Sequence, residues 1–130
     1  MNRPILNINE NNNTISILFN NIDGNASNFD TFVAEISHYK NKFSFIGIAE
    51  TNIDAHHKDL YNISNFNSEY NSKFSGKNKG SGIGLYIHED MIFKRIEKYC
   101  RCSKNLESLF VQITNTESPL TVGVIYRPPS

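Results

Sequence analysis

The sequence FSFIGIA at residues 43–49 contains almost no polar side chain, and its length is that of a β-strand. A strand with so little polar alternation is typical of one that is covered on both faces, as in a parallel sheet. The run TISILFN at residues 14–20 combines β-branched and apolar side chains and predicts another buried strand. Together these two runs predict the centre of a sheet.

Between the two predicted strands, apolar side chains recur at helical spacing. Ser27 followed by Asp30 resembles a capping box, so we predict a helix from about residue 27 to residue 40. Strand, helix and strand in this order form a βαβ unit, in which the two strands run parallel. The apolar positions of the predicted helix are Phe29, Phe32, Val33, Ile36 and Tyr39.

Three later apolar runs predict further strands, at residues 82–87, 108–113 and 120–126. We expect them to be antiparallel additions to the same sheet, and NTESP is a hairpin-type connection between the last two. Residues 51–80 are polar, apart from a short apolar segment around residues 60–66. The expected architecture is therefore an α/β sheet with helices on at least one face.

The overall composition fits one domain. The chain has 130 residues and a formal net charge of zero, so no global charge indicates a nucleic acid or membrane partner. We predict a flexible lead-in at residues 1–13 and a domain at residues 14–130. The apolar runs are too short for a transmembrane helix, and the N-terminus has no secretory pattern. We therefore expect an intracellular protein, cytoplasmic or nuclear and not secreted, whose Cys100 and Cys102 are free thiols.

Polar side chains stand at the ends of the first two predicted strands. The first strand ends at Asn20 and Asn21, and the second is followed by Glu50. Parallel strands end at the same edge of a sheet, so Asn21 and Glu50 are expected to lie close together, where open α/β sheets bind ligands. Their oxygen atoms suit a hard cation such as Mg²⁺. The alternative reading of Glu50 is a solvated loop carboxylate or a helix-start acid.

The last predicted strand ends in YRPP. Pro128 and Pro129 cannot donate to a sheet ladder and must end the strand. Tyr126 therefore places its phenol at the rim of the sheet, and Arg127 follows it directly.

Five segments in order resemble the endonuclease/exonuclease/phosphatase superfamily, specifically the apurinic-like endonuclease domain of non-LTR retrotransposons. The resemblance extends from about residue 14 to residue 130, and the five segments together, rather than any single one, make it specific. The segments are ISILFNNIDG (15–24), FSFIGIAETNI (43–53), GSGIGLYI (80–87), LESLFVQI (106–113) and GVIYRPPS (123–130).

The resemblance implies a four-layer α/β/β/α sandwich, in which a mixed sheet is flanked by helices, and this chain would supply one of its two sheets. It also implies Mg²⁺-dependent hydrolysis of a phosphodiester bond in DNA, with Mn²⁺ as the alternative ion. Glu50 would hold the metal, Asn21 would orient that carboxylate or the phosphate, and Tyr126 would hydrogen-bond to the phosphate. In such retrotransposons the nick exposes a 3′-hydroxyl that primes reverse transcription.

The chain departs from this family pattern at several positions. Asn52 replaces the tryptophan that is usual after the Glu-Thr pair, Phe19 stands where a histidine is frequent, and Asp23 where a basic residue often lies. The family's later Asp, Asn and His residues match no segment before Ser130. We therefore expect the second half of the fold to be absent and the chain by itself to be an incomplete, inactive domain.

Partners follow from the same reading. Lys73, Lys77, Lys79 and Arg127 are candidate DNA-binding residues, although a solvated loop is the alternative for the three lysines. If the second sheet is absent, the inner face of the first sheet is exposed and apolar, which predicts self-association. Two other functions remain open: a non-catalytic fragment or DNA-binding remnant, and another phosphoesterase of the same superfamily.

Overall fold

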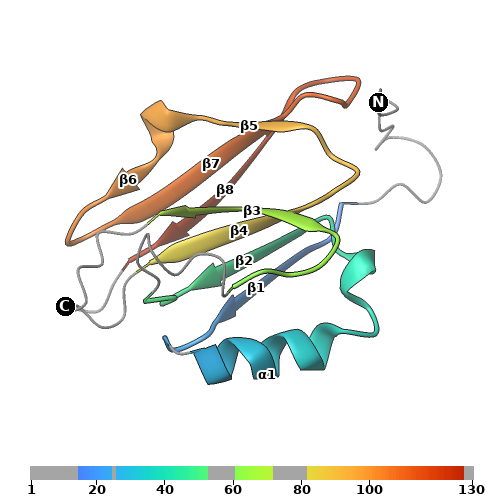
Figure 1. Cartoon of the computed structure of the whole chain (residues 1–130). Helices are drawn as coiled ribbons and strands as arrows, with labels where there is room; N and C mark the ends of the chain where they lie inside the picture. The colour runs from blue at the N-terminus through green and yellow to red at the C-terminus, as the bar shows by residue number, and fades with distance from the viewer. Residues whose placement is uncertain (1–14, 25, 53–60, 72–81, 128–130) are drawn as a thin grey trace.

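The structure, a computed structural model, describes residues 15–24, 26–52, 61–71 and 82–127 (Figure 1). None of the helices in these ranges is long and apolar enough to cross a membrane. The predicted lead-in at residues 1–13 lies outside the described residues. The elements are β1 (Ile17–Asn21), α1 (Ala26–Ile36), η1 (Lys40–Lys42), β2 (Phe45–Ala49), β3 (Phe66–Asn71), β4 (Ile83–His88), β5 (Phe93–Arg95), η3 (Glu97–Tyr99), β6 (Arg101–Cys102), β7 (Glu107–Ile113) and β8 (Leu120–Tyr126).

The strands form two sheets rather than the single sheet that the sequence predicts. The first sheet has the order β1-β2-β4-β3, and β1 and β2 are parallel, as expected. In the second sheet β7 pairs with β5, β6 and β8. The hairpin of β7 and β8 is confirmed, but these two strands do not extend the first sheet. The structure is thus a mixed α/β fold with more strand than helix.

The predicted helix is present but shorter than expected. α1 ends at Ile36, where the amides of Ser37 and Tyr39 bond to carbonyls three residues back and tighten the last turn. Ser27 is not the cap, because it lies inside the helix and its carbonyl accepts the Thr31 hydroxyl at 3.0 Å. The 3-10 helix η1 then leads into β2.

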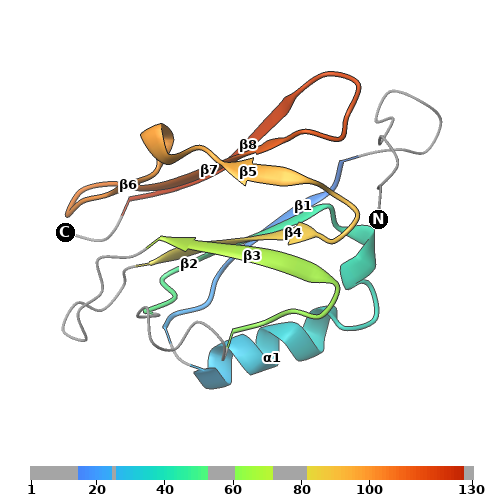
Figure 2. The same ribbon diagram turned by 45° about the horizontal axis from the view of Figure 1, so that its top comes forward.

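Both faces of β2 are buried, and they face different layers (Figure 2). Phe45 and Ala49 belong to a core between the two sheets, whereas Ile46 and Ile48 belong to a core beneath α1. Side chains alternate along a strand, so the uninterrupted apolar run of β2 fills two cores at once. Three layers result in the described chain: α1, the first sheet and the second sheet.

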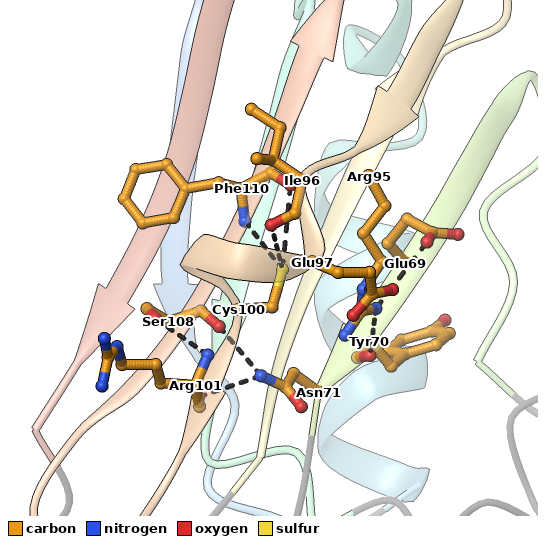
Figure 3. A network of polar contacts seen from close by, with 10 residues as sticks. All are labelled: Glu69, Tyr70, Asn71, Arg95, Ile96, Glu97, Cys100, Arg101, Ser108 and Phe110. Atoms are coloured by element: carbon orange, nitrogen blue, oxygen red, sulfur yellow. Dashed lines mark hydrogen bonds and ion pairs between the residues drawn. The ribbon is translucent and has the colours of Figure 1, made fainter.

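A network of polar contacts joins the two sheets at one side (Figure 3). Arg95 of β5 donates to the Tyr70 carbonyl of β3 at 2.8 Å and forms ion pairs with Glu97 and Glu69, at 2.9 Å and 3.7 Å. The side-chain amide of Asn71 donates to the Ser108 carbonyl at 2.8 Å. These contacts hold β3 against β5 and β7.

On the opposite side the sheets are offset. Within the described residues, β1 pairs only with β2 and β8 pairs only with β7. Ile17 and Phe19 of β1 are 59% and 50% exposed. Together with Val122 and Val124 of β8 they line an apolar groove of about 280 Å³. The expectation of an exposed inner face is wrong, because the second sheet covers most of it. Ile17, Phe19 and Ile125, the most exposed of the large apolar side chains in the described residues, line this groove.

Tyr86 anchors the core beneath α1 and gives a stability prediction. Its hydroxyl donates to the Tyr61 carbonyl at 2.6 Å and contacts the Tyr70 hydroxyl at 2.9 Å. A Tyr86→Phe variant is expected to unfold more easily by about 1 kcal/mol, because the buried carbonyl then keeps only the Tyr70 hydroxyl. Thermal melts at neutral pH test this, with the half-exposed Tyr99→Phe as the control.

The same residue gives the stability a pH dependence. Burial, and then the neighbouring Tyr70, raise the pKa of Tyr86 well above its ordinary value. The folded protein therefore holds this proton more tightly than the unfolded chain, so its stabilisation is complete below about pH 10 and is lost as the pH rises further. Part of this alkaline loss should disappear in Tyr86→Phe; identical alkaline profiles would contradict the assignment.

Candidate active site

Three side chains from distant parts of the chain converge at one end of the two sheets. The Tyr126 hydroxyl, at the end of β8, donates to Oε1 of Glu50, which follows β2. Asn21, at the end of β1, lies close enough to the same phenol for its side chain to favour the ionised form of Tyr126. All three residues that the sequence singled out are therefore in one cluster, which we call the Asn21–Glu50–Tyr126 trio.

The backbone conformation of Glu50 brings its carboxylate to the phenol. Glu50 has a φ of +54°, in the left-handed region that few non-glycine residues occupy. Ala49 faces the space between the sheets, so an extended residue 50 would face α1 instead. The left-handed conformation reverses this direction. Such strain persists where the surrounding structure holds it, which is a common property of functional sites.

Hydrogen bonds fix the chain on both sides of Glu50. The Ala49 carbonyl accepts the Ile22 amide at 3.1 Å, which extends the pairing of β1 and β2. The Thr51 amide donates to the Gly82 carbonyl at 3.2 Å, which links the end of β2 to the residue before β4. Ala49 and Thr51 are therefore fixed by hydrogen bonds to the segments on either side of β2, and Glu50 lies between them.

The loop after β1 packs against the same segment. Gly24 has a φ of +72°, and its carbonyl accepts the side-chain amide of Asn52 at 3.4 Å. Asp23 and Asn52 have positive φ values of 48° and 49°. Asn52 thus joins the two loops that carry Asn21 and Glu50.

The phenol of Tyr126 is a hydrogen-bond donor rather than a base. Burial raises its pKa above the ordinary value for tyrosine, and the hydrogen bond to Glu50 and the charges of Glu50 and Glu107 raise it further. The side chain of Asn21 lowers the pKa, but its effect is smaller than those of burial, Glu50 and Glu107. At neutral pH the phenol therefore keeps its proton and can donate a hydrogen bond to a carboxylate or phosphate oxygen.

Glu107 is a residue of this site that sequence reasoning did not identify. Its carboxylate is 1% exposed and accepts the Gly82 amide, at 3.0 Å to Oε1 and 2.9 Å to Oε2. It is the cross-strand partner of Tyr126. The signal in the sequence is an acidic residue at the start of an apolar strand, in LESLFVQI, one of the five segments that carry the resemblance.

The candidate DNA-binding residues are only partly covered. Lys73, Lys77 and Lys79 lie outside the described residues. Arg127 is exposed and directly follows Tyr126. A hollow of about 230 Å³ beside Asn21 is lined in part by Asp23 and Glu35, whose charge disfavours a phosphate there.

The donor set of the trio fits a hard cation. Glu50 supplies a half-buried carboxylate, and Asn21 supplies an amide oxygen that already accepts the Asp23 amide at 3.0 Å. Mg²⁺ is commonly held by one or two carboxylates, with water and phosphate as its other ligands. In the described part of the chain no group of three or more His, Cys, Asp or Glu side chains forms a metal site, so any ion here would take most of its ligands from water or substrate.

Gly24 allows a test of how tightly the two loops fit. A Cβ atom on Gly24 would lie 1.8 Å from Nδ2 of Asn52, at a positive φ that disfavours alanine. We expect Gly24→Ala to lower the free energy of unfolding by about 1–3 kcal/mol and to displace the loop that carries Asn52. Thermal melts measure the change. A Gly24→Ala/Asn52→Gly double variant should recover the part of the lost stability that comes from the collision of the added Cβ with the Asn52 side chain. No recovery would contradict this packing.

Comparisons with known proteins add no relatives. No protein-family model matches the chain, and no curated protein matches it.

Proposed function

We propose that the chain carries the cation-binding part of a Mg²⁺-dependent phosphodiesterase site that acts on DNA, in the manner of retrotransposon-type nicking endonucleases. The observation that carries the proposal is the convergence of the Asn21–Glu50–Tyr126 trio from β1, β2 and β8. The resemblance of five sequence segments supports the choice of substrate, and the oxygen donors support the choice of ion. Mn²⁺ is expected to replace Mg²⁺.

Each residue of the trio has a distinct role in this proposal. Bound Mg²⁺ supplies positive charge that stabilises the negative charge developing on a phosphoryl oxygen. Glu50 provides the anionic oxygen that holds the ion. Tyr126 donates a hydrogen bond, which passes from Glu50 to a phosphate oxygen when substrate is present. Asn21, whose side chain interacts with the same phenol, orients it toward the substrate.

The fold and the charges support the same assignment. The order of layers, α1 on one sheet and that sheet on a second, corresponds to three layers of the α/β/β/α sandwich that we propose for the complete domain. Arg127 is exposed, directly follows Tyr126 in the sequence and would contact the phosphate backbone. The two described acidic residues beside Asn21, Asp23 and Glu35, direct the DNA away from that hollow and toward Arg127.

A second candidate is a site that binds DNA without turnover. The resemblance implies further Asp, Asn and His residues that would activate water, and none of the described residues around the trio matches them. This favours cation-dependent DNA binding over rapid hydrolysis in the chain alone.

Plasmid nicking and DNA binding distinguish these two functions. Supercoiled plasmid is incubated with the chain in Mg²⁺ or EDTA, and binding of a labelled duplex is followed by fluorescence anisotropy. Mg²⁺-dependent nicking that Glu50→Gln abolishes supports the phosphodiesterase. Binding that Mg²⁺ strengthens, with no nicking, supports the second candidate. If Mg²⁺ and the Glu50→Gln substitution affect neither, both functions are excluded.

A further inference from the structure

The buried carboxylate of Glu107 belongs to the residue that is paired across the strands with Tyr126 of the trio. Both of its oxygens accept the Gly82 amide, and the Cys102 thiol lies 3.8 Å from Oε2 as a further donor. Burying a carboxylate is unfavourable unless hydrogen bonds compensate for the lost water. An apolar residue at this position would avoid that cost, so the buried carboxylate calls for a specific role.

Gly82 connects Glu107 to the backbone that carries Glu50. Its amide donates to Glu107, and its carbonyl accepts the Thr51 amide at 3.2 Å. Thr51 is 1% exposed and directly follows Glu50. Two consecutive hydrogen bonds thus lead from the Glu107 side chain to the position where β2 ends.

Glu107 also lies beside the second partner of the site. In the register of β7 and β8 it is paired with Tyr126, and its charge contributes to the raised pKa of that phenol. Glu107 is therefore the cross-strand neighbour of Tyr126 and is connected through Gly82 and Thr51 to the backbone of Glu50. That hydrogen bond joins the first sheet to the second at the site.

We propose that Glu107 is a positioning residue that, through the Gly82 amide, holds Glu50 in its left-handed conformation opposite Tyr126. If Gly82 is released, the Thr51 amide loses its fixed acceptor, and the disfavoured backbone of Glu50 can relax toward the extended form. The Glu50 carboxylate would then turn toward α1 and away from the phenol. The role of Glu50 as a cation ligand in this inference rests on the proposed function.

Backbone amide exchange and metal binding test the inference together. In Glu107→Gln the buried shape is retained, but one of the two acceptors of the Gly82 amide is lost. We expect the Thr51 amide to exchange with solvent roughly tenfold faster, measured by NMR, while the Ile46 amide in the middle of β2 is unchanged. The affinity for Mn²⁺, followed by electron paramagnetic resonance, should fall roughly tenfold, as is typical when the support of a ligand is removed.

Two variants separate this role from general effects. Glu69→Gln removes a carboxylate that forms an ion pair with Arg95 and that, among the described residues, makes no hydrogen bond with Gly82 or Glu107, so it should change neither reading. Glu107→Asp keeps the charge but shortens the side chain, so it should loosen Thr51 as Glu107→Gln does. It also serves as the test if Glu107→Gln does not fold.

The possible results distinguish a failure of the positioning role of Glu107 from a failure of the proposed function. Faster exchange of Thr51 and Ile46 to the same extent would show a general loss of stability and overturn the positioning role. Thr51 exchange and Mn²⁺ affinity within about twofold of the wild type would also overturn it. If the wild type binds no Mn²⁺, or Glu50→Gln binds it equally well, the proposed function fails. The exchange of Thr51 relative to Ile46 then decides the inference about Glu107.

Discussion

A Glu50→Gln variant is expected to bind Mg²⁺ and Mn²⁺ roughly 100-fold more weakly than the wild type, a loss of about 2.7 kcal/mol. The substitution removes the one carboxylate of the trio, and an amide oxygen is a much weaker ligand for a hard cation. Glutamine can still accept the hydrogen bond of Tyr126, so the fold should be retained. Titration calorimetry with Mg²⁺ and electron paramagnetic resonance with Mn²⁺ measure the change, and thermal melts without metal verify the fold.

The matched control for this prediction is Glu35→Gln. Glu35 is an exposed carboxylate of α1 that lines the hollow beside Asn21, so its substitution removes the same charge from the same neighbourhood. Its effect on cation affinity should stay within about threefold. Equal losses in the two variants would mean that the ion responds to the local negative charge and not to a ligand at position 50, which would contradict the metal site.

The positions of Asn21 and Glu50 could be predicted because they depend on a single local rule. Once β1 and β2 are parallel neighbours, their carboxyl ends must lie at the same edge. The conformation of Glu50 could not be predicted in this way. We infer that its left-handed backbone is held through the Gly82 carbonyl, which lies 32 residues further along the chain, and nothing in the sequence around Glu50 indicates it.

The division into two sheets could not be predicted for a related reason. Alternation of side chains shows that a segment is a strand but not which strand it pairs with. β7 and β8 are apolar runs of strand length like β4, yet they belong to the second sheet. The short strands β5 and β6 and the polar strand β3 were missed, since FNSEYN has too few apolar residues to indicate a strand. β3 is an edge strand held by the polar contacts around Arg95 and Asn71, which a hydrophobic pattern does not reveal.

The role of Tyr126 came from another kind of information. A tyrosine before an arginine and two prolines indicates only the end of a strand, and the resemblance supplied its connection to Glu50. The structure gives that connection a physical basis, because the offset of the two sheets brings the end of β8 over the end of β2.

A Phe19→Ser variant is expected to self-associate much more weakly than the wild type. We propose that the apolar groove between β1 and β8 mediates contact between copies, since both strands also present unpaired edges in the described structure. Phe19 is 50% exposed, so its burial would remove roughly 100 Å² of apolar surface from water in each copy. At about 25 cal/mol per Å² this is at most about 2.5 kcal/mol, and about 2 kcal/mol corresponds to roughly a thirtyfold change in affinity for each copy.

Sedimentation velocity over a range of concentrations measures this change. Tyr99→Ser is the matched control, because Tyr99 is 49% exposed and belongs to η3 rather than to the groove. If Phe19→Ser shifts the monomer fraction and Tyr99→Ser does not, the groove is the contact surface. Equal shifts would mean that exposed aromatic side chains promote association wherever they lie. A wild type that stays monomeric at every concentration would show that Ile17 and Phe19 are tolerated as exposed surface, and the proposal of self-association would then be wrong.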